Sequence, residues 1–526
     1  MRYLFALIAV IVLSAPVFAQ QDAADTQGRH ADLEQLGAEL LARHPNPFAN
    51  IDRSDWESAV SDLDGKLDGM TPNQFGVALQ RLVALLGDAN TSVNPQRDTA
   101  LSKRRYPVEL YLFEDGLYVR RAAPEFGDIV GGKVVLIGKA DPGDAIRAVA
   151  ETISHENTWW IRALAPERLV IPEVLDGLGL VDDLEHLPLT VEKEGGTTTA
   201  TLSPVAVVGL GDDRRGAAID ESDWIDMDTA AEPPQWRRHP GELMWHAWLD
   251  EQNALYVCYR AVTSPNDGLS NAEFWNEVFG EVDRRHPEYF VIDIRENSEG
   301  NRMLNRNVIQ QIMRRPEIDR SDRFFVIIGR RTFSAAQQFA SQLDWWTQAT
   351  FVGEPTGQRV SQYGDSKPVV LDNSGISVNI STLFHQAPDA LDNRDFIPPD
   401  IYAPLKSGDY RNGTDPALDA VFTARDREPV MARVLGALQA GQVDRAQRLL
   451  ANSKMDPANR YRSFESDMNA VGYDLMAHGR IDAAVSIFRI NTQVYPGSAN
   501  AFDSLGEALE KAGRREEAIA AYRKAL

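Results

Sequence analysis

The stretch from Tyr289 to Gly357 reads YFVIDIRENSEGN at its start, FFVIIGRRTFSAAQQFA in its middle and ATFVGEPTG at its end, and it is the most informative part of the chain. Three short apolar runs rich in Val, Ile and Phe alternate with segments of helical composition. This alternation is typical of parallel βαβ units, so the sequence predicts an α/β core here. Ser334 stands just after the second run, where the next helix is expected to begin.

The position of Ser334 has two interpretations. A hydroxyl at a helix N-terminus lies beside unpaired backbone N–H groups and the positive end of the helix dipole. The same groups would stabilise an oxyanion formed there, which suits a nucleophile. Most serines at such places only cap the helix through a hydrogen bond, and this is the structural alternative.

Several ordered motifs surround this serine. They are IDIRENSEG at residues 292–300, TFSAA at 332–336, GEPTG at 353–357, YGD at 363–365, NSG at 373–375 and PPDI at 398–401. Together these motifs resemble those of the tail-specific serine proteases, which include the C-terminal-processing proteases and the tricorn core. The resemblance covers roughly residues 33–422. It implies a crotonase-like α/β core and peptide cleavage through an acyl-enzyme on Ser334.

The resemblance also assigns an oxyanion hole to the backbone N–H groups of Ala335 and Gly300. In the loop that contains Gly300, the family usually has two consecutive glycines. Here the first of these two positions is Glu299. If that position required a positive φ, glutamate would be strained there by about 1–3 kcal/mol.

The general base is missing from both positions where the family places one. One branch uses a lysine after its GExT motif, and Gln358 stands there, followed by Arg359. The other branch uses a histidine in a DxHT motif, which reads Asp88-Ala89-Asn90-Thr91 here. Neither amide can take up a proton at neutral pH, and arginine does not lose one. Loss of the base from a serine triad lowers kcat by about 10⁶-fold.

Other residues are candidates for the remaining roles. The resemblance places the acidic partner at Asp392, with Asp395 as the nearby alternative, and either could be only an exposed loop carboxylate. His385, on an expected strand of the core, is a candidate substitute base, although a lone histidine is more often structural. His155, His239 and His246 lie in less certain regions. No histidine shows metal-ligand spacing, so we expect no metal and no cofactor.

Two functions therefore remain open. The first is a serine-type peptidase that cleaves peptides or unfolded proteins. The second is a catalytically impaired pseudo-peptidase that binds peptides or partner proteins, which the residues at Asn90, Gln358 and Glu299 favour.

The composition of the chain excludes some classes of binding partner. The chain has 526 residues and a formal net charge of −23, which argues against nucleic acid and anionic membranes as partners. A single cysteine, Cys258, allows no internal disulfide, and it is expected to be buried in a strand.

The N-terminus, MRYLFALIAVIVLSAPVFAQ, is typical of a secretory signal peptide over residues 1–19. Cleavage after Ala19 would leave a periplasmic or secreted protein with no membrane span, and an uncleaved anchor is the alternative. Residues 20–29 are polar and are expected to be disordered.

The rest of the chain divides by pattern. Residues 30–95 predict an N-terminal helical region. Residues 106–204 predict a β-rich region, which resembles the PDZ-like region of the tail-specific proteases and either captures peptides or is structural. Residues 205–240 are interpreted as a linker or an excursion over the active site, and the resemblance implies that residues 241–422 are the catalytic core.

Residues 428–526 predict α-helical tetratricopeptide repeats. Val471, Gly472, Leu475, Gly479, Ala484 and Phe488 recur 34 positions later as Leu505, Gly506, Leu509, Gly513, Ala518 and Tyr522. The chain stops at Leu526 without a polar capping helix. The exposed apolar face could cover the core, a second copy or a partner protein.

Overall fold

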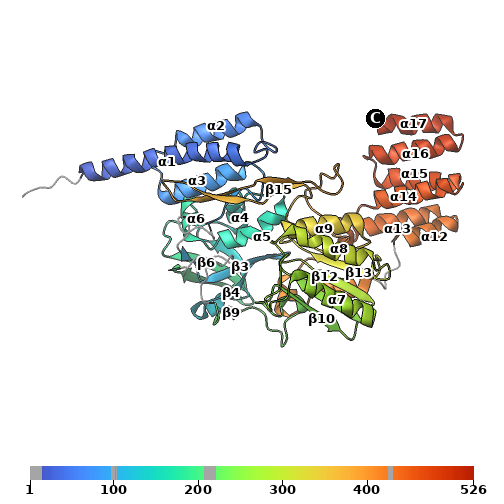
Figure 1. The fold of residues 1–526 in the computed structure, drawn as a ribbon, viewed down its shortest axis with the longest axis horizontal. Helices are drawn as coiled ribbons and strands as arrows, with labels where there is room; N and C mark the ends of the chain where they lie inside the picture. The colour runs from blue at the N-terminus through green and yellow to red at the C-terminus, as the bar shows by residue number, and fades with distance from the viewer. Residues whose placement is uncertain (1–14, 96–100, 102–103, 207–220, 425–429) are drawn as a thin grey trace, which may run out of the picture. The chain divides into compact units, whose positions relative to one another are not determined.

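The computed structural model describes residues 15–95, 101, 104–206, 221–424 and 430–526, and the side chains from residue 26 onward except that of residue 439. The chain forms two compact units (Figure 1). Unit 1 contains Met1–Ala231, Gly357–Asp395 and Lys406–Gly413, and unit 2 contains Glu232–Thr356, Phe396–Leu405 and Thr414–Leu526. No helix among the described residues is long and apolar enough to cross a membrane.

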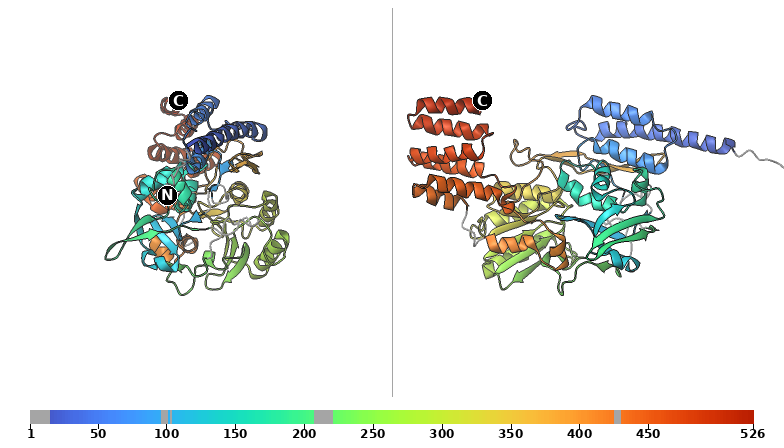
Figure 2. Two further views of the ribbon diagram at one scale, coloured as in Figure 1. Left: turned by 90° about the vertical axis from the view of Figure 1, so that its left-hand side faces the viewer. Right: turned by 180° about the vertical axis from the view of Figure 1, so that it is seen from behind.

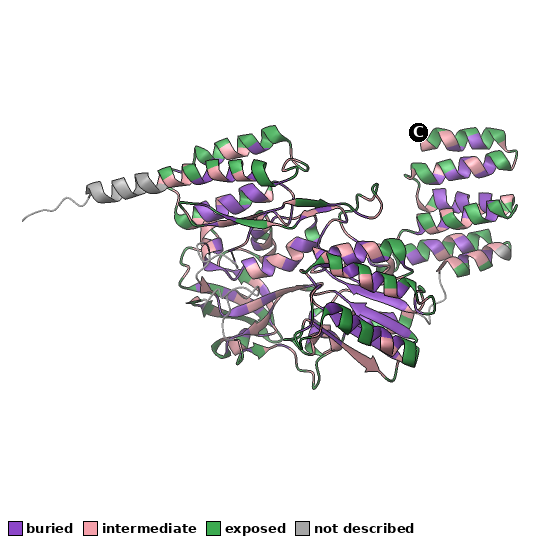
Figure 3. Ribbon diagram, viewed as in Figure 1, coloured by how far each residue is buried: buried purple, intermediate pink, exposed green. Residues whose placement is uncertain are grey.

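A six-stranded sheet forms the core of unit 2. In spatial order its strands are β10 (Met244–Leu249), β11 (Ala254–Tyr259), β12 (Tyr289–Asp293), β13 (Phe324–Ile328), β14 (Thr350–Gly353) and β19 (Ile401–Tyr402). Only β10 runs antiparallel to its neighbour, so the predicted parallel βαβ units are confirmed. Every residue of β11, β12 and β13 is buried, including Cys258, as expected of strands covered on both faces (Figure 3).

Helices cover both faces of this sheet. They are α7 (Asn271–Arg285), α8 (Asn305–Met313), α9 (Ala335–Trp346) and α11 (Pro416–Ala424). The Tyr259 ring packs against Trp275 of α7 and Phe339 of α9 on one face. On the other face, Leu418 and Val421 of α11 join an apolar cluster that includes residues of β10 to β14. The mixed α/β class is thereby confirmed.

Six further helices of unit 2 follow one another toward the C-terminus (Figure 2). They are α12 (Val430–Gln439), α13 (Val443–Met455), α14 (Phe464–Ala477), α15 (Ile481–Val494), α16 (Ala499–Lys511) and α17 (Arg515–Ala525). Gly472 lies under the Phe488 ring, and Gly506 lies under the Tyr522 ring in the same way. These pairs are 34 residues apart, which agrees with the repeat in the sequence.

Unit 1 contains an antiparallel sheet. Its strands are β3 (Val108–Phe113), β4 (Gly116–Ala122), β5 (Lys133–Ile137), β6 (Leu187–Lys193), β7 (Gly196–Leu202) and β9 (Ile225–Asp226). Around it are α4 (Pro142–Ala150), α5 (Thr158–Arg168), α6 (Pro172–Gly177), α10 (Ser407–Arg411) and the short pair β2 (Arg104–Arg105) and β8 (Val205–Ala206). Because β9 pairs with β4, part of the segment expected to be a linker or an excursion belongs to this sheet. Residues 207–220 lie outside the described residues.

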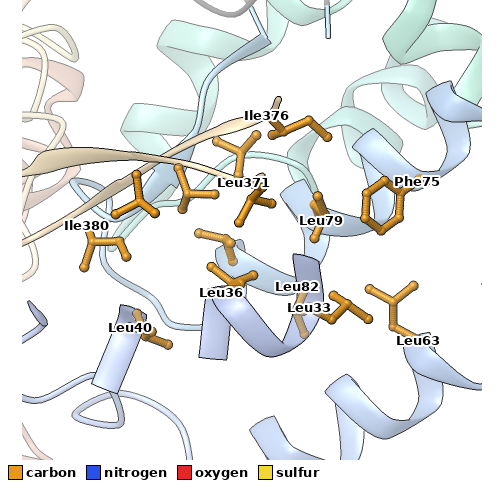
Figure 4. Packing of buried hydrophobic residues seen from close by; sticks show 14 of the residues in the cluster. Leu33, Leu36, Leu40, Leu63, Phe75, Leu79, Leu82, Leu371, Ile376 and Ile380 are labelled. Atoms are coloured by element: carbon orange, nitrogen blue, oxygen red, sulfur yellow. The ribbon is translucent and has the colours of Figure 1, made fainter. Parts of the chain in front are cut away.

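An apolar cluster in unit 1 joins helices to a small sheet (Figure 4). Its elements are α1 (Ala15–Arg43), α2 (Arg53–Asp64), α3 (Pro72–Ala84), β1 (Ser92–Val93), β16 (Lys367–Val370) and β17 (Ser377–Ile380). Leu33, Leu36 and Leu40 anchor α1 at helical spacing. The expectation of disorder over residues 20–29 is wrong, because α1 already begins at Ala15. The predicted signal peptide lies largely outside the described residues, which start at residue 15.

Candidate active site

Ser334 occupies a sharp turn between a buried strand and a helix. The turn follows β13, and α9 begins at the next residue, Ala335. The backbone of Ser334 has φ 54° and ψ −119°, a conformation that costs an L-residue about 1–3 kcal/mol. Its side chain makes no capping hydrogen bond to the helix, so the N-cap interpretation is wrong. A partly exposed serine on a strained strand-to-helix turn has the geometry of a nucleophile elbow.

Buried hydrogen bonds hold this turn in place. The Thr332 hydroxyl donates to the Ile294 carbonyl at 2.9 Å and accepts from the Gly329 N–H at 3.0 Å. The Phe333 N–H donates to the Asn297 carbonyl at 3.0 Å. Ile294 and Asn297 follow β12, so the loops after two adjacent strands over-determine the conformation that Ser334 adopts.

Gly300, the first predicted oxyanion donor, lies in the loop after β12 and is fixed by backbone contacts. The Val262 N–H donates to the Glu299 carbonyl at 3.0 Å, and the Asn301 N–H donates to the Val262 carbonyl at 2.7 Å. Gly300 has φ 129°, whereas Glu299 is not among the described residues with a positive φ. Glutamate is therefore unstrained, and glycine stands where the backbone requires it.

Ala335, the second predicted donor, is the first residue of α9. Its N–H belongs to the first turn, which has no partner within the helix and carries the positive end of the helix dipole. The Asn305 side-chain amide donates to the Ala335 carbonyl at 3.0 Å, which ties the start of α8 to the start of α9. Ser334, Gly300 and Ala335 all belong to unit 2, at the carboxyl ends of its parallel strands, where α/β sheets commonly bind ligands.

Both vacated base positions belong to unit 1. The Asn90 side-chain amide donates to the Tyr363 carbonyl at 2.9 Å, and its backbone N–H donates to Asp88 Oδ1 at 3.0 Å. Gln358 is fully buried, and its Nε2 lies 3.5 Å from Glu156 Oε1. These contacts use each amide as a neutral hydrogen-bonding group.

His385 has a carboxylate partner. It lies on β18 (Leu383–His385), which pairs with β15 (Gln362–Gly364) in a two-stranded sheet of unit 1. The strand expected at His385 is confirmed, but it belongs to unit 1 and not to the six-stranded core sheet of unit 2. The Nε2 of His385 lies 2.7 Å from Asp365 Oδ2, and the residue is only 7% exposed.

Gly364 brings His385 close to the vacated histidine position. A Cβ built on Gly364 would lie 3.2 Å from His385 Nε2 and 3.9 Å from Asn90 Nδ2. The imidazole and the Asn90 amide thus share the space over one glycine. The chain has a histidine and a carboxylate beside the position where the family motif has its histidine.

Glu156 was not found from the sequence. Its Oε1 accepts from the Ala89 N–H at 3.3 Å, and its buried Oε2 has no hydrogen-bond partner among the described residues. Burial, together with the nearby Asp88 carboxylate, raises the pKa of Glu156 to about 8. An uncharged carboxyl group therefore lies between the two vacated base positions at neutral pH. The sequence did not reveal Glu156 because this residue follows a turn with no recognisable motif.

The neighbouring Asp88 belongs to a separate buried network. It accepts from the Ser381 hydroxyl at 2.7 Å and lies 3.1 Å from His44 Nε2. Because His44 Nδ1 accepts from the Asn46 N–H at 3.1 Å, the ring hydrogen belongs on Nε2. His44 is thus fixed as a neutral donor to Asp88.

The predicted acidic partners are paired with arginines. Asp392 Oδ2 accepts from Arg394 Nη2 at 2.7 Å. Burial acts to raise the pKa of Asp392, but the hydrogen bonds and charge of Arg394 outweigh it, and the pKa is lowered. Asp395 Oδ1 lies 2.8 Å from Arg359 Nη2. Asp365, rather than either of these, contacts His385.

The other candidate histidines have local partners. His155 Nδ1 lies 2.6 Å from the Ile153 carbonyl, and His239 Nδ1 lies 3.6 Å from Glu242 Oε1. The His246 ring packs against Phe274, and burial lowers its pKa. Across the described ranges, no group of three or more His, Cys, Asp or Glu side chains could hold a metal ion.

Comparison with known proteins bears on the fold. No family model matches the chain, and no curated protein matches it in sequence. Mature CPAF complexed with lactacystin matches with a TM-score of 0.53 and 14% identity, over 76% of this chain and 98% of that chain. A serine-to-alanine mutant of CPAF matches with a TM-score of 0.55 and 14% identity, over 76% and 97%. The photosystem II D1 C-terminal processing protease matches with a TM-score of 0.35 and 16% identity, over 76% and 98%.

The structural neighbours are thus CPAF, the D1 processing protease and S41 proteases. The two CPAF structures, with TM-scores of 0.53 and 0.55, support the fold that the motifs implied. At 14% identity, the likeness to CPAF is one of fold.

Proposed function

We propose, from this tail-specific protease fold, that the chain is a serine-type peptidase that cleaves unstructured peptide segments through an acyl-enzyme on Ser334. The observation that carries the proposal is the strained conformation of Ser334, at φ 54° and ψ −119°, on a turn that the surrounding loops over-determine. Strain of this kind persists where the structure holds a reactive group in one orientation.

The chemistry assigns each group a role. The Ser334 oxygen attacks the scissile carbonyl carbon, and the carbonyl oxygen becomes an oxyanion that accepts from the N–H groups of Ala335 and Gly300. The hydroxyl proton passes to a base, which then donates it to the leaving amine nitrogen. Water hydrolyses the resulting ester and regenerates the serine. No cofactor is required.

We propose His385 as the base because its ring has a carboxylate partner within unit 1. In a serine mechanism one ring nitrogen takes the proton while the other hydrogen-bonds to a carboxylate that orients the ring. The Asp365 carboxylate is suited to that orienting role, because it lies 2.7 Å from His385 Nε2. Asp392 keeps its predicted role only as an alternative, since Arg394 neutralises it.

The remaining inferences concern location and partners. We infer that residues 1–19 are a secretory leader and that the mature chain acts in the periplasm or outside the cell. We also infer that α12 to α17 are tetratricopeptide repeats that bind a partner protein or a second copy. The glycine–aromatic pairs Gly472–Phe488 and Gly506–Tyr522 support this interpretation, because they recur at the period of such repeats.

Cleavage of a fluorescently labelled unfolded protein tests the function. We expect cleavage by the wild-type chain and none by Ser334→Ala. His385→Gln should lower kcat by about 10³-fold or more, because the base is lost. The matched control His239→Gln, at an exposed histidine, should leave the rate unchanged.

Other outcomes would change the assignment. A wild-type rate in His385→Gln would exclude it as the base. An inactive wild-type chain that gains activity from Asn90→His would show a pseudo-peptidase with a vacated active site, acting as a peptide- or protein-binding module.

A further inference from the structure

An apolar groove lies between α8 and α9 in unit 2. It begins at the short helix Arg302–Leu304 that precedes α8 and has a volume of about 480 Å³. Its main lining residues are Arg302, Met303, Arg306, Ile309, Met313 and Trp346. We call it the α8–α9 groove. Its volume falls within the range of about 300–1,000 Å³ that is usual for ligand pockets.

The apolar side chains of the groove are unusually exposed. Met303 is 67% exposed, Met313 50% and Trp346 45%. Contiguous exposed apolar side chains mark binding surfaces. Methionine adapts its shape to different ligands, and tryptophan is enriched among residues that dominate binding. The surface is therefore suited to apolar side chains of varied shape.

Two arginines give the groove a positive rim. In the part of the chain that the structure describes, neither Arg302 nor Arg306 forms an ion pair or a side-chain hydrogen bond. By contrast, Arg315, just beyond the end of α8, pairs with Asp283 at 2.7 Å. Although the chain has a net charge of −23, these two cations have no carboxylate partner among the described residues. The groove is complementary to an acidic ligand.

The groove is continuous with the loop after β12 that contains Gly300, the proposed oxyanion donor. Arg302 follows Gly300 by two residues, and the intervening Asn301 donates its N–H to the Val262 carbonyl. At the other side, the bond from Asn305 to Ala335 connects α8 to the residue after Ser334. A ligand in the groove would therefore contact the elements that hold both oxyanion donors.

We propose that the α8–α9 groove binds a segment of the peptide substrate in which large apolar side chains alternate with acidic ones. The apolar side chains would pack on Met303, Met313 and Trp346, and the carboxylates would pair with Arg302 and Arg306. This substrate class rests on the proposed peptidase function, but binding in the groove does not require cleavage.

Fluorescence anisotropy measures the binding directly. The protein is the chain with Ser334→Ala, which prevents cleavage, and the probe is a fluorescein-labelled peptide of alternating Leu and Glu. We expect saturable binding that weakens with added salt. Combining Arg302→Gln with Arg306→Gln should weaken it about fivefold or more, and Trp346→Ala about tenfold or more. A matched peptide with Gln in place of Glu should bind more weakly.

Arg314→Gln is the matched control, because Arg314 is exposed at the end of α8 and does not line the groove. It should leave the affinity unchanged. Absence of saturable binding, or equal binding by the groove variants, would overturn the proposal. Two other results would also overturn the proposal. One is binding of the chain to vesicles of anionic and neutral phospholipid that the groove variants abolish. The other is a dimer in sedimentation that the groove variants abolish.

Failure of the proposed peptidase function can be distinguished from failure of the groove proposal. In a Ser334-intact background, the control Arg314→Gln should retain fluorophosphonate labelling and the wild-type rate, whereas the groove variants should lower kcat/KM toward long acidic substrates. Absence of labelling in every variant, with peptide binding intact, would reject the peptidase and keep the groove.

Discussion

Gly300 lies directly against the backbone of Val262: a Cβ built on Gly300 would stand 2.3 Å from the Val262 carbonyl oxygen. The two residues form a parallel bridge between loops that follow β11 and β12. The loop that carries the proposed oxyanion donor Gly300 is therefore held by backbone contacts on which a side chain would intrude.

Gly300→Ala should distort this loop. The added Cβ would meet backbone atoms that cannot move aside, at a residue with φ 129°. We expect the free energy of unfolding, measured with denaturant, to fall by about 1–3 kcal/mol. Fluorophosphonate labelling should also be lost. Gly280→Ala, inside α7 with no atom within 4 Å of the new Cβ, is the control and should stabilise the chain slightly. Equal effects of the two substitutions would contradict the role of the bridge.

Ser334→Gly should stabilise the fold while removing the nucleophile. Glycine adopts φ 54° and ψ −119° without strain, whereas alanine keeps the strain. We expect the glycine variant to exceed Ser334→Ala by about 1 kcal/mol or more in the free energy of unfolding. Denaturant titration of both variants measures the difference. An alanine variant as stable as the glycine variant would show that the turn is unstrained.

The C-terminal helices offer a test of close packing. A Cβ on Gly472 would lie 2.3 Å from the Phe488 ring, so Gly472→Ala should destabilise these helices by about 1–3 kcal/mol. Phe488→Leu should suppress much of that penalty in the double mutant. Gly436→Ala in α12, where no atom lies within 4 Å of the new Cβ, should be stabilising instead. Additive effects of Gly472→Ala and Phe488→Leu on thermal unfolding would contradict the packing.

Glu156 should make stability depend on pH. Its carboxyl group changes pKa from an ordinary 4.5 to about 8 on folding, so between these values the folded chain holds a proton that the unfolded chain lacks. This contribution is complete below about pH 4.5 and is lost as the pH rises through about 8.

Glu156→Gln removes that titration. Its free energy of unfolding relative to wild type should rise with pH across the same window, by at most about 1.4 kcal/mol per pH unit. Denaturant midpoints of both proteins at about pH 5, 7 and 9 measure this. A difference that does not change with pH would show that Glu156 is charged in the folded chain.

The sequence predicted those features that depend on local pattern. The apolar runs of β12, β13 and β14 indicated buried parallel strands because both faces of each strand must be covered. The TFSAA motif located Ser334 at the start of α9, but its backbone strain arises from contacts with Ile294 and Asn297 that no local pattern reveals.

Other parts of the site depend on contacts between distant residues. Asp365 and His385 meet because β15 and β18 pair in one particular register, which the sequence of neither strand specifies. Glu156 is buried by residues that are 67 and 202 positions away. The polar residues 20–29 looked disordered because α1 gains its stability from leucines that follow them.

Mass spectrometry of the intact chain after treatment with a fluorophosphonate tests the nucleophile assignment most directly. The Ser334 oxygen should displace fluoride from phosphorus, leaving one phosphonyl adduct that peptide mapping places on Ser334. Ser334→Ala should remain unmodified. His385→Gln should react far more slowly, and His239→Gln at the wild-type rate. A folded wild-type chain without an adduct on Ser334 would contradict the assignment of this serine as a catalytic nucleophile.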